Sequence, residues 1–203
     1  NNLIYSADRE ETLLEQAISA ARTLDSSYLT IQGPPGTGKT YTGKHIIADL
    51  LKEGKSIGIA SNSHKAINNL LMAAAEYCNK VGVDGEFFCT QQTDDRIPQL
   101  GVNVTSNTHI ADIAGPGVVI GATAWGFSRS EMVGRLDYLI VDEAGQISVA
   151  NLAGMSGSAK NIILMGDQQQ LGQPNQGEHP GESGESTLEY LLKGTPAISP
   201  GAC

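Results

Sequence analysis

Short apolar runs recur along the chain and are separated by polar or glycine-containing segments. They occupy residues 28–32, 56–60, 117–121, 137–141 and 161–165. None of them alternates cleanly between apolar and polar positions, as is typical of strands in a parallel sheet that is covered on both faces. We therefore predict buried, parallel strands at these positions.

Segments with apolar residues at helical spacing separate most of these runs or precede them. They occupy residues 8–24, 39–53 and 64–79. Asp8 and Glu11 form a candidate capping box for the first segment, and Gly54 ends the second. This order predicts an α/β fold, in which a mostly parallel sheet carries helices on both faces, joined by right-handed crossovers. Ligands of such sheets bind at the carboxyl ends of the strands.

The remaining stretches carry weaker patterns. Residues 80–116 are irregular and predict a short strand at 86–89 and a polar loop around 94–98. Residues 172–182 are rich in Gly, Pro and Gln and predict a loop, which a brief helix follows over 185–193.

Composition and charge narrow the class of protein. The length of 203 residues suits one domain over residues 1–203, and the start at Asn1 leads us to expect a piece of a longer protein. The formal net charge of −9 argues against a coating protein with a basic face, but not against a narrow nucleic-acid strip of amides and hydroxyls. No run approaches the ~20 apolar residues that cross a bilayer, so we expect no membrane partner. The three dispersed cysteines predict reduced thiols and a cytoplasmic protein.

One motif indicates the class of ligand that the chain binds. Between an apolar run and a helical segment stands a G-x-x-x-x-G-K-[ST] phosphate-binding loop. Its residues are Gly33, Pro34, Pro35, Gly36, Thr37, Gly38, Lys39 and Thr40. The glycines let successive backbone N–H groups turn around a polyphosphate, while Lys39 reaches the β- and γ-phosphates and Thr40 ligates Mg²⁺. The chain is therefore predicted to bind a nucleoside triphosphate.

Two carboxylates follow the apolar residues 138–141. Asp142 is placed to contact the Mg²⁺ shell beside Thr40, and Glu143 to accept a proton from the attacking water. An Asp-Glu pair also commonly begins a helix, where it interacts favourably with the helix dipole. The phosphate-binding loop in the same chain favours the catalytic interpretation.

A further polar segment, Gly-Asp-Gln-Gln-Gln-Leu, ends the run near residue 165 and occupies 166–171. A polar side chain at the tip of a strand beside the nucleotide can sense the γ-phosphate. The alternative is a turn whose glutamines face solvent. The residues alone do not choose among the three glutamines.

In this order the motifs resemble motifs I, II and III of superfamily 1 helicases, carried by the loop at 33–40, Val-Asp-Glu-Ala-Gly-Gln at 141–146 and the segment at 166–171. Residues 60–66 resemble motif Ia, and 121–125 the threonine-containing motif that follows it. The chain is most similar to the subgroup with the nonsense-mediated-decay helicase and the Dna2-type nuclease–helicases, including bacterial helicases fused to a RecB-family nuclease.

This resemblance implies a RecA-like first motor domain that binds ATP and Mg²⁺ and moves along a single strand. It assigns Lys39 and Thr40 to phosphate and magnesium, Asp142 to the metal, Glu143 to the catalytic base, and Gln170 to the γ-phosphate sensor. Residues that fall where the family touches single-stranded nucleic acid are Ser61, Asn62, His64, Thr123 and Trp125. DNA is favoured over RNA. A second RecA-like domain, with the arginines that complete the ATP site, is expected in the parent chain, and a fused nuclease is left open.

Alternatives remain for individual residues and for the whole chain. Ser61 and Asn62 also suit the start of a helix, and Trp125 also suits packing between helices rather than stacking on a base. A small GTPase or nucleoside kinase is a second class, although guanine recognition usually needs Asn-Lys-x-Asp, and Asn79-Lys80 continues differently. A nucleotide-gated binding module that never hydrolyses is a third.

Overall fold

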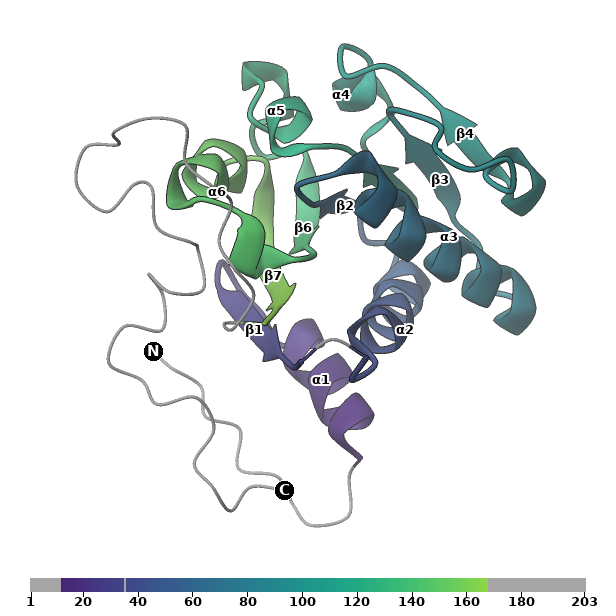
Figure 1. The fold of residues 1–203 in the computed structure, drawn as a ribbon, viewed down its shortest axis with the longest axis vertical. Helices are drawn as coiled ribbons and strands as arrows, with labels where there is room; N and C mark the ends of the chain where they lie inside the picture. The colour runs from purple at the N-terminus through teal and green to yellow at the C-terminus, as the bar shows by residue number, and fades with distance from the viewer. Residues whose placement is uncertain (1–11, 35, 168–203) are drawn as a thin grey trace.

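The computed structural model describes residues 12–34 and 36–167. A seven-stranded sheet forms the centre of this part, in the order β1-β7-β6-β2-β5-β3-β4, and all of its pairings are parallel (Figure 1). The strands are β1 (Tyr28–Gln32), β2 (Ile57–Ala60), β3 (Glu86–Cys89), β4 (Val102–Val104), β5 (Val118–Gly121), β6 (Leu136–Val141) and β7 (Ala159–Gly166). The prediction of an α/β fold with a parallel sheet is confirmed.

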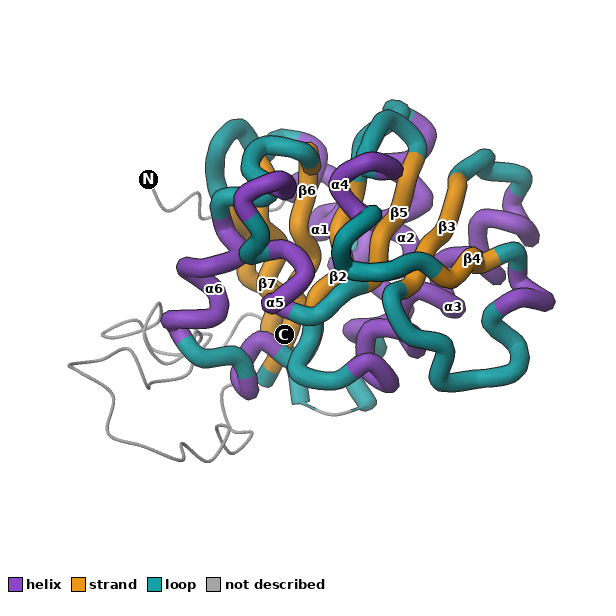
Figure 2. Tube along the Cα trace, turned by 90° about the horizontal axis from the view of Figure 1, so that it is seen from above, coloured by secondary structure: helices purple, strands orange, loops and turns teal. Residues whose placement is uncertain are grey.

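Helices cover both faces of the sheet (Figure 2). The α-helices are α1 (Leu13–Arg22), α2 (Lys39–Lys52), α3 (His64–Val81), α4 (Ile110–Ile113), α5 (Ala124–Phe127) and α6 (Val149–Ser156). The 3₁₀ turns are η1 (Pro98–Leu100), η2 (Ser130–Met132) and η3 (Ala144–Gln146). One hydrophobic core joins α1, α2 and α3 to the sheet, and a second core lies under α4, α5 and α6.

Alternate residues of the interior strands enter the two cores. Tyr138 and Ile140 of β6 pack with the first core, whereas Leu139 and Val141 pack with the second. Both sets are apolar because both faces are covered, which explains why the runs did not alternate in the sequence.

The first helix begins later than predicted. Thr12 is extended and caps α1, because its side chain accepts from the Glu15 backbone while the Glu15 carboxylate accepts from the Thr12 backbone. This Thr-x-x-Glu box places the helix start at Leu13 rather than near residue 8, so the earlier start was wrong. Asp8 and Glu11 lie outside the described residues.

Other differences lie in the irregular stretch at 80–116 and in the segments between the later strands. The strand at 86–89 is confirmed, but β4, α4, α5 and α6 were not predicted. The predicted loop at 172–182 and helix at 185–193 lie outside the described residues.

The sheet topology determines which loops meet. Gln32 of β1 is the register partner of Gly166 of β7, and Val141 of β6 is the register partner of Ala60 of β2. The segments that follow β1, β6 and β2 therefore leave the sheet at the same edge, where the predicted site residues lie. β1 is the outermost described strand on one side of the sheet and β4 on the other.

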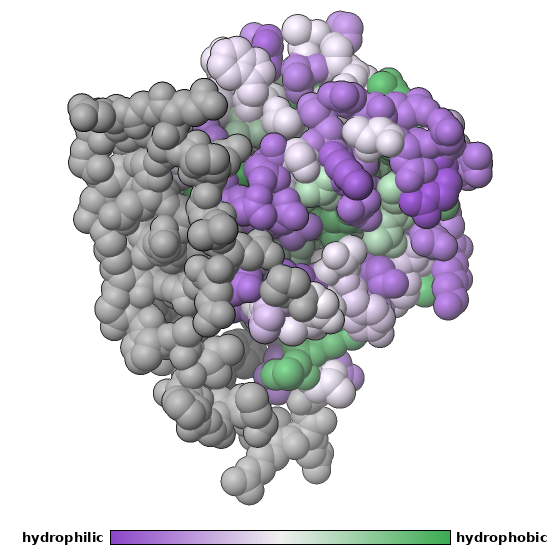
Figure 3. Space-filling model, viewed as in Figure 1, coloured by the Kyte–Doolittle hydropathy of each residue, from purple (hydrophilic) through white to green (hydrophobic). Residues whose placement is uncertain are grey.

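No described helix combines the length and apolar character needed to span a bilayer. The described part of the face in Figure 3 is mostly hydrophilic.

Candidate functional site

The phosphate-binding loop leaves the outer strand β1 and turns directly into α2. The Gly33 backbone donates a hydrogen bond of 3.1 Å to the Gly166 carbonyl, which ties the start of the loop to β7. Gly36 and Gly38 have φ values of 83° and 88°, a conformation that residues with a Cβ rarely adopt. The glycines of the motif thus shape the backbone, as the pattern predicts; Pro35 lies outside the described residues.

The loop also closes tightly on itself. The Thr37 hydroxyl donates a hydrogen bond of 2.7 Å to the Pro34 carbonyl. A Cβ at Gly33 would lie 2.4 Å from the Thr37 hydroxyl oxygen, so no side chain fits at Gly33 without movement.

The ammonium group of Lys39 is held by the loop that precedes it. It donates to the Gly33 carbonyl and, over 2.9 Å, to the Pro34 carbonyl. Lys39 is the first residue of α2 and is half-buried, and the adjacent Thr40 is exposed. A cation and a free hydroxyl therefore stand together at the amino end of α2, where the helix dipole also favours an anion.

Asp142 follows the interior strand β6, and its carboxyl group is partly desolvated. Burial raises the pKa of its carboxyl group and the neighbouring charge of Glu143 adds to this, whereas the hydrogen bond from the Glu143 backbone and the charge of Lys39 lower it. β1 and β6 flank β7, so they are about 10 Å apart across the sheet.

These groups fit a magnesium-bound polyphosphate. The Thr40 hydroxyl and the Asp142 carboxylate are the oxygen ligands that Mg²⁺ prefers. The open turn at Gly36, where an added Cβ would meet nothing within 4 Å, leaves the loop accessible to a ligand. Within the described ranges no group of three His, Cys, Asp or Glu side chains forms a metal site of its own.

Glu143 has an unusual backbone and a specific partner. Its φ of 53° lies in the left-handed region, which is uncommon for a residue other than glycine. Its carboxylate accepts a hydrogen bond of 3.3 Å from the Ser61 hydroxyl, which follows β2. The structure therefore joins a residue of motif Ia to a residue of motif II across adjacent strands.

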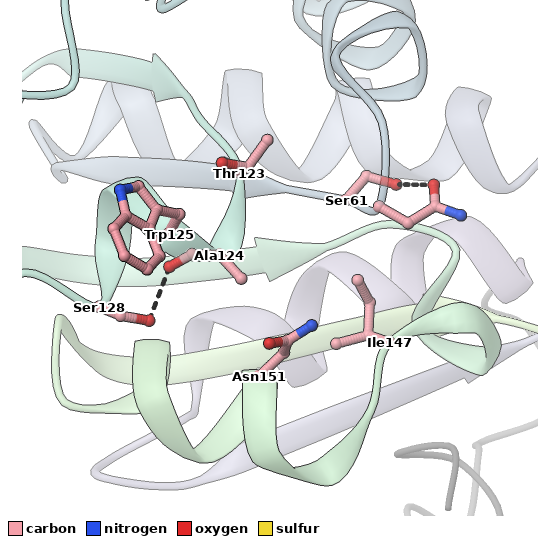
Figure 4. Close-up of a pocket in the computed structure, with 8 residues that line it drawn as sticks. Ser61, Thr123, Ala124, Trp125, Ser128, Ile147 and Asn151 are labelled. Carbon is pink, nitrogen blue, oxygen red and sulfur yellow. Dashed lines mark hydrogen bonds between the residues drawn. The ribbon is translucent and has the colours of Figure 1, made fainter. Parts of the chain in front are cut away.

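A pocket of about 250 Å³ opens beside this contact (Figure 4). It is lined by Ser61, Asn62, Thr123, Ala124, Trp125, Ser128, Ile147 and Asn151. Four of the five residues predicted to touch a strand are thus brought together on one surface. His64 does not line the pocket; it begins α3, and burial lowers the pKa of its imidazole.

Two structural alternatives for these residues are wrong. Trp125 is 78% exposed, so it is not packed between helices. Ser61 and Asn62 do not cap α3, because Ser63 does so by accepting a hydrogen bond of 3.2 Å from the Ala66 backbone. The amide of Asn62 instead donates to the side chain of Gln146.

Sequence reasoning missed the wall of the pocket that η3, α5 and α6 supply. Ser128, Ile147 and Asn151 belong to no motif, and they reach the pocket because α5 packs against α6. The only available signal was their nearness in sequence to Trp125 and to Gln146. Gln170, the predicted γ-phosphate sensor, lies outside the described residues.

A parallel sheet with a phosphate-binding loop after β1 and paired carboxylates after β6 defines an α/β nucleotide-binding domain of the phosphate-binding-loop class. A family model described as an AAA domain matches residues 13–183, and the chain belongs to this family.

Two similar relatives are much longer than this chain. The DNA replication ATP-dependent helicase/nuclease JHS1 of Arabidopsis thaliana is 32% identical over 152 residues, covering 71% of this chain and 11% of the relative. The DNA replication ATP-dependent helicase/nuclease DNA2 of Mus musculus is 30% identical over 162 residues, covering 73% and 14%. The inferred similarity to Dna2-type helicases is confirmed. Since the chain spans only a small part of these proteins, their whole activity is not carried over by the match.

A solved structure, the complex of Arterivirus nonstructural protein 10 (helicase) with DNA, has a TM-score of 0.44 and 20% identity. It covers 82% of this chain and 34% of that one. This likeness is too distant to add to the sequence match.

Proposed function

We propose that this chain is the first, ATP-binding motor domain of an ATP-dependent helicase that moves along single-stranded nucleic acid. The observation that carries the proposal is the hydrogen bond from Ser61 to Glu143, because it joins the nucleotide edge of the sheet to the pocket with Trp125. Membership of the family implies that the chain binds a nucleotide. We propose that this nucleotide is ATP and that it binds with Mg²⁺.

At the nucleotide, Lys39 and the loop amides bind the phosphates, while Thr40 and Asp142 hold the magnesium ion. Bound Mg²⁺ neutralises charge that develops on the transferring phosphoryl group. Glu143 accepts the proton of the attacking water, and Gln170 senses the γ-phosphate. Lys39 must exchange its hydrogen bonds with Gly33 and Pro34 for the phosphate oxygens.

At the strand, Trp125 stacks on a base, and Ser61, Asn62 and Thr123 contact the backbone. His64, outside the pocket lining, contributes from the first turn of α3. The hydroxyl and amide groups in the pocket lining can donate hydrogen bonds to phosphates, so binding of a strand does not require a basic groove in this protein of net charge −9. The similarity to DNA2 and JHS1 favours DNA.

We further propose that residues 1–203 form one RecA-like domain whose partner is a second such domain in the parent protein. The similarity to helicase/nucleases makes a fused nuclease consistent with the proposal, and the expected cytoplasmic location stays a prediction.

The test is ATP hydrolysis by the full-length parent protein with and without single-stranded DNA. The wild type should be stimulated by the strand. Glu143→Gln should retain MgATP binding and lose turnover by at least about a hundredfold, the contribution of a general base. Normal turnover by Glu143→Gln would refute the proposal. So would a wild-type protein whose ATP hydrolysis no nucleic acid stimulates.

A further inference from the structure

The pocket beside Trp125 has a lining that suits a nucleobase. None of its eight described lining residues is Lys, Arg or His, so they offer no cationic partner to a phosphate. Ile147 is 2% exposed and forms an apolar surface together with Ala124, and the indole of Trp125 is open to solvent. Ligand pockets typically combine such apolar and aromatic surfaces with a few polar groups that set the orientation. The part of the pocket around Trp125 therefore suits a base better than a phosphate.

Asn151 supplies a free amide to the same pocket. The residue is exposed in the first turn of α6, where Ser148 caps the helix by accepting a hydrogen bond of 3.3 Å from its backbone. Within residues 12–34 and 36–167 the side-chain amide of Asn151 has no hydrogen-bond partner. The hydroxyl of Ser128 is already used, because it donates a hydrogen bond of 2.7 Å to the Ala124 carbonyl. Asn151 therefore offers both a donor and an acceptor to a ligand.

Close packing of α6 on α5 holds this amide beside the indole. A Cβ at Gly154 would lie 2.9 Å from the Ser128 hydroxyl oxygen, so the glycine allows the two helices to approach. Asn151 and Gly154 are three residues apart and therefore share one face of α6. Asn151 from α6 and Trp125 from α5 border the same space (Figure 4). A base stacked on the indole would bring its edge toward the amide.

An asparagine amide can form two hydrogen bonds with one edge of a base, and the pair with adenine N6 and N7 recurs in protein–DNA complexes. In a single strand both the Watson–Crick and the Hoogsteen edges are open to such contacts. Adenine has an amino donor next to a ring-nitrogen acceptor on each of these edges. Guanine, cytosine and thymine have a donor next to an acceptor only on the Watson–Crick edge. Adenine therefore matches the amide in more orientations than the other bases do.

We propose that Asn151 is a specificity-determining residue, which contacts the edge of a nucleobase stacked on Trp125 and favours adenine at this position of the strand. This inference rests on the function proposed above, in which single-stranded nucleic acid occupies the pocket. Ser61, Asn62 and Thr123 contact the backbone of the strand, so one pocket binds a phosphate on one side and a base on the other. The strand is then bound with a base preference, although the phosphate contacts carry no sequence information.

The experiment measures how tightly the full-length parent protein binds labelled oligodeoxyadenylate and oligodeoxythymidylate of equal length, by fluorescence anisotropy. The quantity compared is the dissociation constant for thymidylate divided by that for adenylate. Stacking within the free adenylate strand affects this ratio equally in every variant, so a change between variants belongs to the protein. Asn151→Ala should lower the ratio by about 5- to 10-fold, the lower part of the range for two hydrogen bonds to one base edge. Asn151→Asp keeps the shape but loses the amide donor, and it should lower the ratio in the same direction.

Asn103→Ala is the matched control. Asn103 is an exposed asparagine on β4 and does not line the pocket, so its removal should leave the ratio unchanged. The variants at Asn151 should fold normally, because its side chain is exposed and the Ser148 cap uses its backbone. Trp125→Ala should weaken the binding of both strands and also lower the ratio, since the amide contacts a base that the indole holds.

The possible results separate the base contact from the proposed function. An unchanged ratio in Asn151→Ala would overturn the inference. An equal loss of affinity for both strands would also overturn it, because Asn151 would then contact the sugar–phosphate backbone. Failure of the wild type to bind either strand would instead defeat the proposed function. A ratio that falls in Asn151→Ala and Asn151→Asp, but not in Asn103→Ala, supports the inference.

Discussion

The hydroxyl of Tyr138 donates a hydrogen bond of 3.0 Å to the carbonyl oxygen of Ala21, and so joins β6 to the last turn of α1. Tyr138 is 3% exposed and Ala21 1%. The strand that leads into Asp142 and Glu143 is thereby fixed to the helix that precedes the phosphate-binding strand.

Tyr138→Phe should lower the free energy of unfolding by about 1 kcal/mol, because it removes one buried hydrogen bond while the ring remains. Urea unfolding of the 203-residue chain measures this. Tyr28→Phe is the control, since Tyr28 is 47% exposed, and it should have little effect. Equal losses in the two variants would contradict the role of the buried contact.

The 203-residue chain alone should bind MgATP weakly and hydrolyse it negligibly. In the proposed function, the arginines that stabilise the transferring phosphate come from the second motor domain, and such arginines contribute ~10³–10⁵ in rate. Phosphate release under single-turnover conditions checks this, with the full-length parent as the positive control. Robust strand-stimulated turnover by the chain alone would show that the site is complete without the second domain.

Gly33→Ala should weaken binding of a fluorescent ATP analogue and cost about 1–3 kcal/mol of stability, because the new methyl group collides with the Thr37 hydroxyl. The double variant Gly33→Ala/Thr37→Ala should recover part of the stability.

Gly36→Ala provides the contrast for this pair. An added Cβ there meets nothing within 4 Å, but φ is 83°, so the cost is backbone strain of about 1–2 kcal/mol, which Thr37→Ala should not relieve. If Thr37→Ala restored the stability of Gly36→Ala, the cost at Gly36 would not be backbone strain. If Thr37→Ala restored none of the stability of Gly33→Ala, the cost at Gly33 would not be the collision with Thr37.

Trp125→Ala should weaken binding of a labelled oligothymidylate by about 5- to 150-fold, the equivalent of one base stacked on an aromatic ring at 1–3 kcal/mol. Trp125→Phe should keep most of the affinity. Fluorescence anisotropy gives the dissociation constants, and Val133→Ala is a control at another exposed apolar position, 68% exposed and outside the pocket lining. Since the chain has one tryptophan, quenching of its emission in the wild type reports the same event.

Burial raises the pKa of the Cys78 thiol to about 11 and also raises the pKa of Cys89. Both thiols should therefore resist iodoacetamide at pH 8 in the folded protein and react after unfolding in guanidinium. In the unfolded chain the Cys78 thiol has its ordinary pKa of 9.0, below the folded value, so stability should fall as the pH rises from about 9 to 11. Cys78→Ala should reduce this fall, and rapid labelling of both thiols in the native state would contradict their burial.

The sequence allowed a close prediction of the fold where patterns are local. β1 matches the predicted run at 28–32 residue for residue, and the loop motif correctly places the start of α2 at Lys39. β4 has three residues, and α4 and α5 have four each, so they are too short to show a period. The start of α1 was misplaced because the sequence analysis did not single out Thr12 and Glu15, which form the capping box of this helix.

The sequence allowed the residues of the candidate site to be proposed one by one. It did not allow a prediction of which of them contact each other. Motif resemblance singled out Ser61, Glu143 and Trp125 separately. The hydrogen bond that joins Ser61 to Glu143 spans 82 residues, and it depends on β2 pairing with β6, which no local pattern specifies. The left-handed backbone of Glu143 had no sequence signal either, because the residue is not glycine.

Among the described strands, β1 pairs with β7 alone, although it carries the phosphate-binding loop. A peripheral strand opens locally more easily than one flanked on both sides, and local opening occurs at lower free energy than global unfolding. Amide protons of 28–32 should accordingly exchange with deuterium before those of interior β6. Phosphate binding by the loop after β1 should then be lost first under mild denaturant. The pocket beside Trp125 should stay folded at that denaturant concentration.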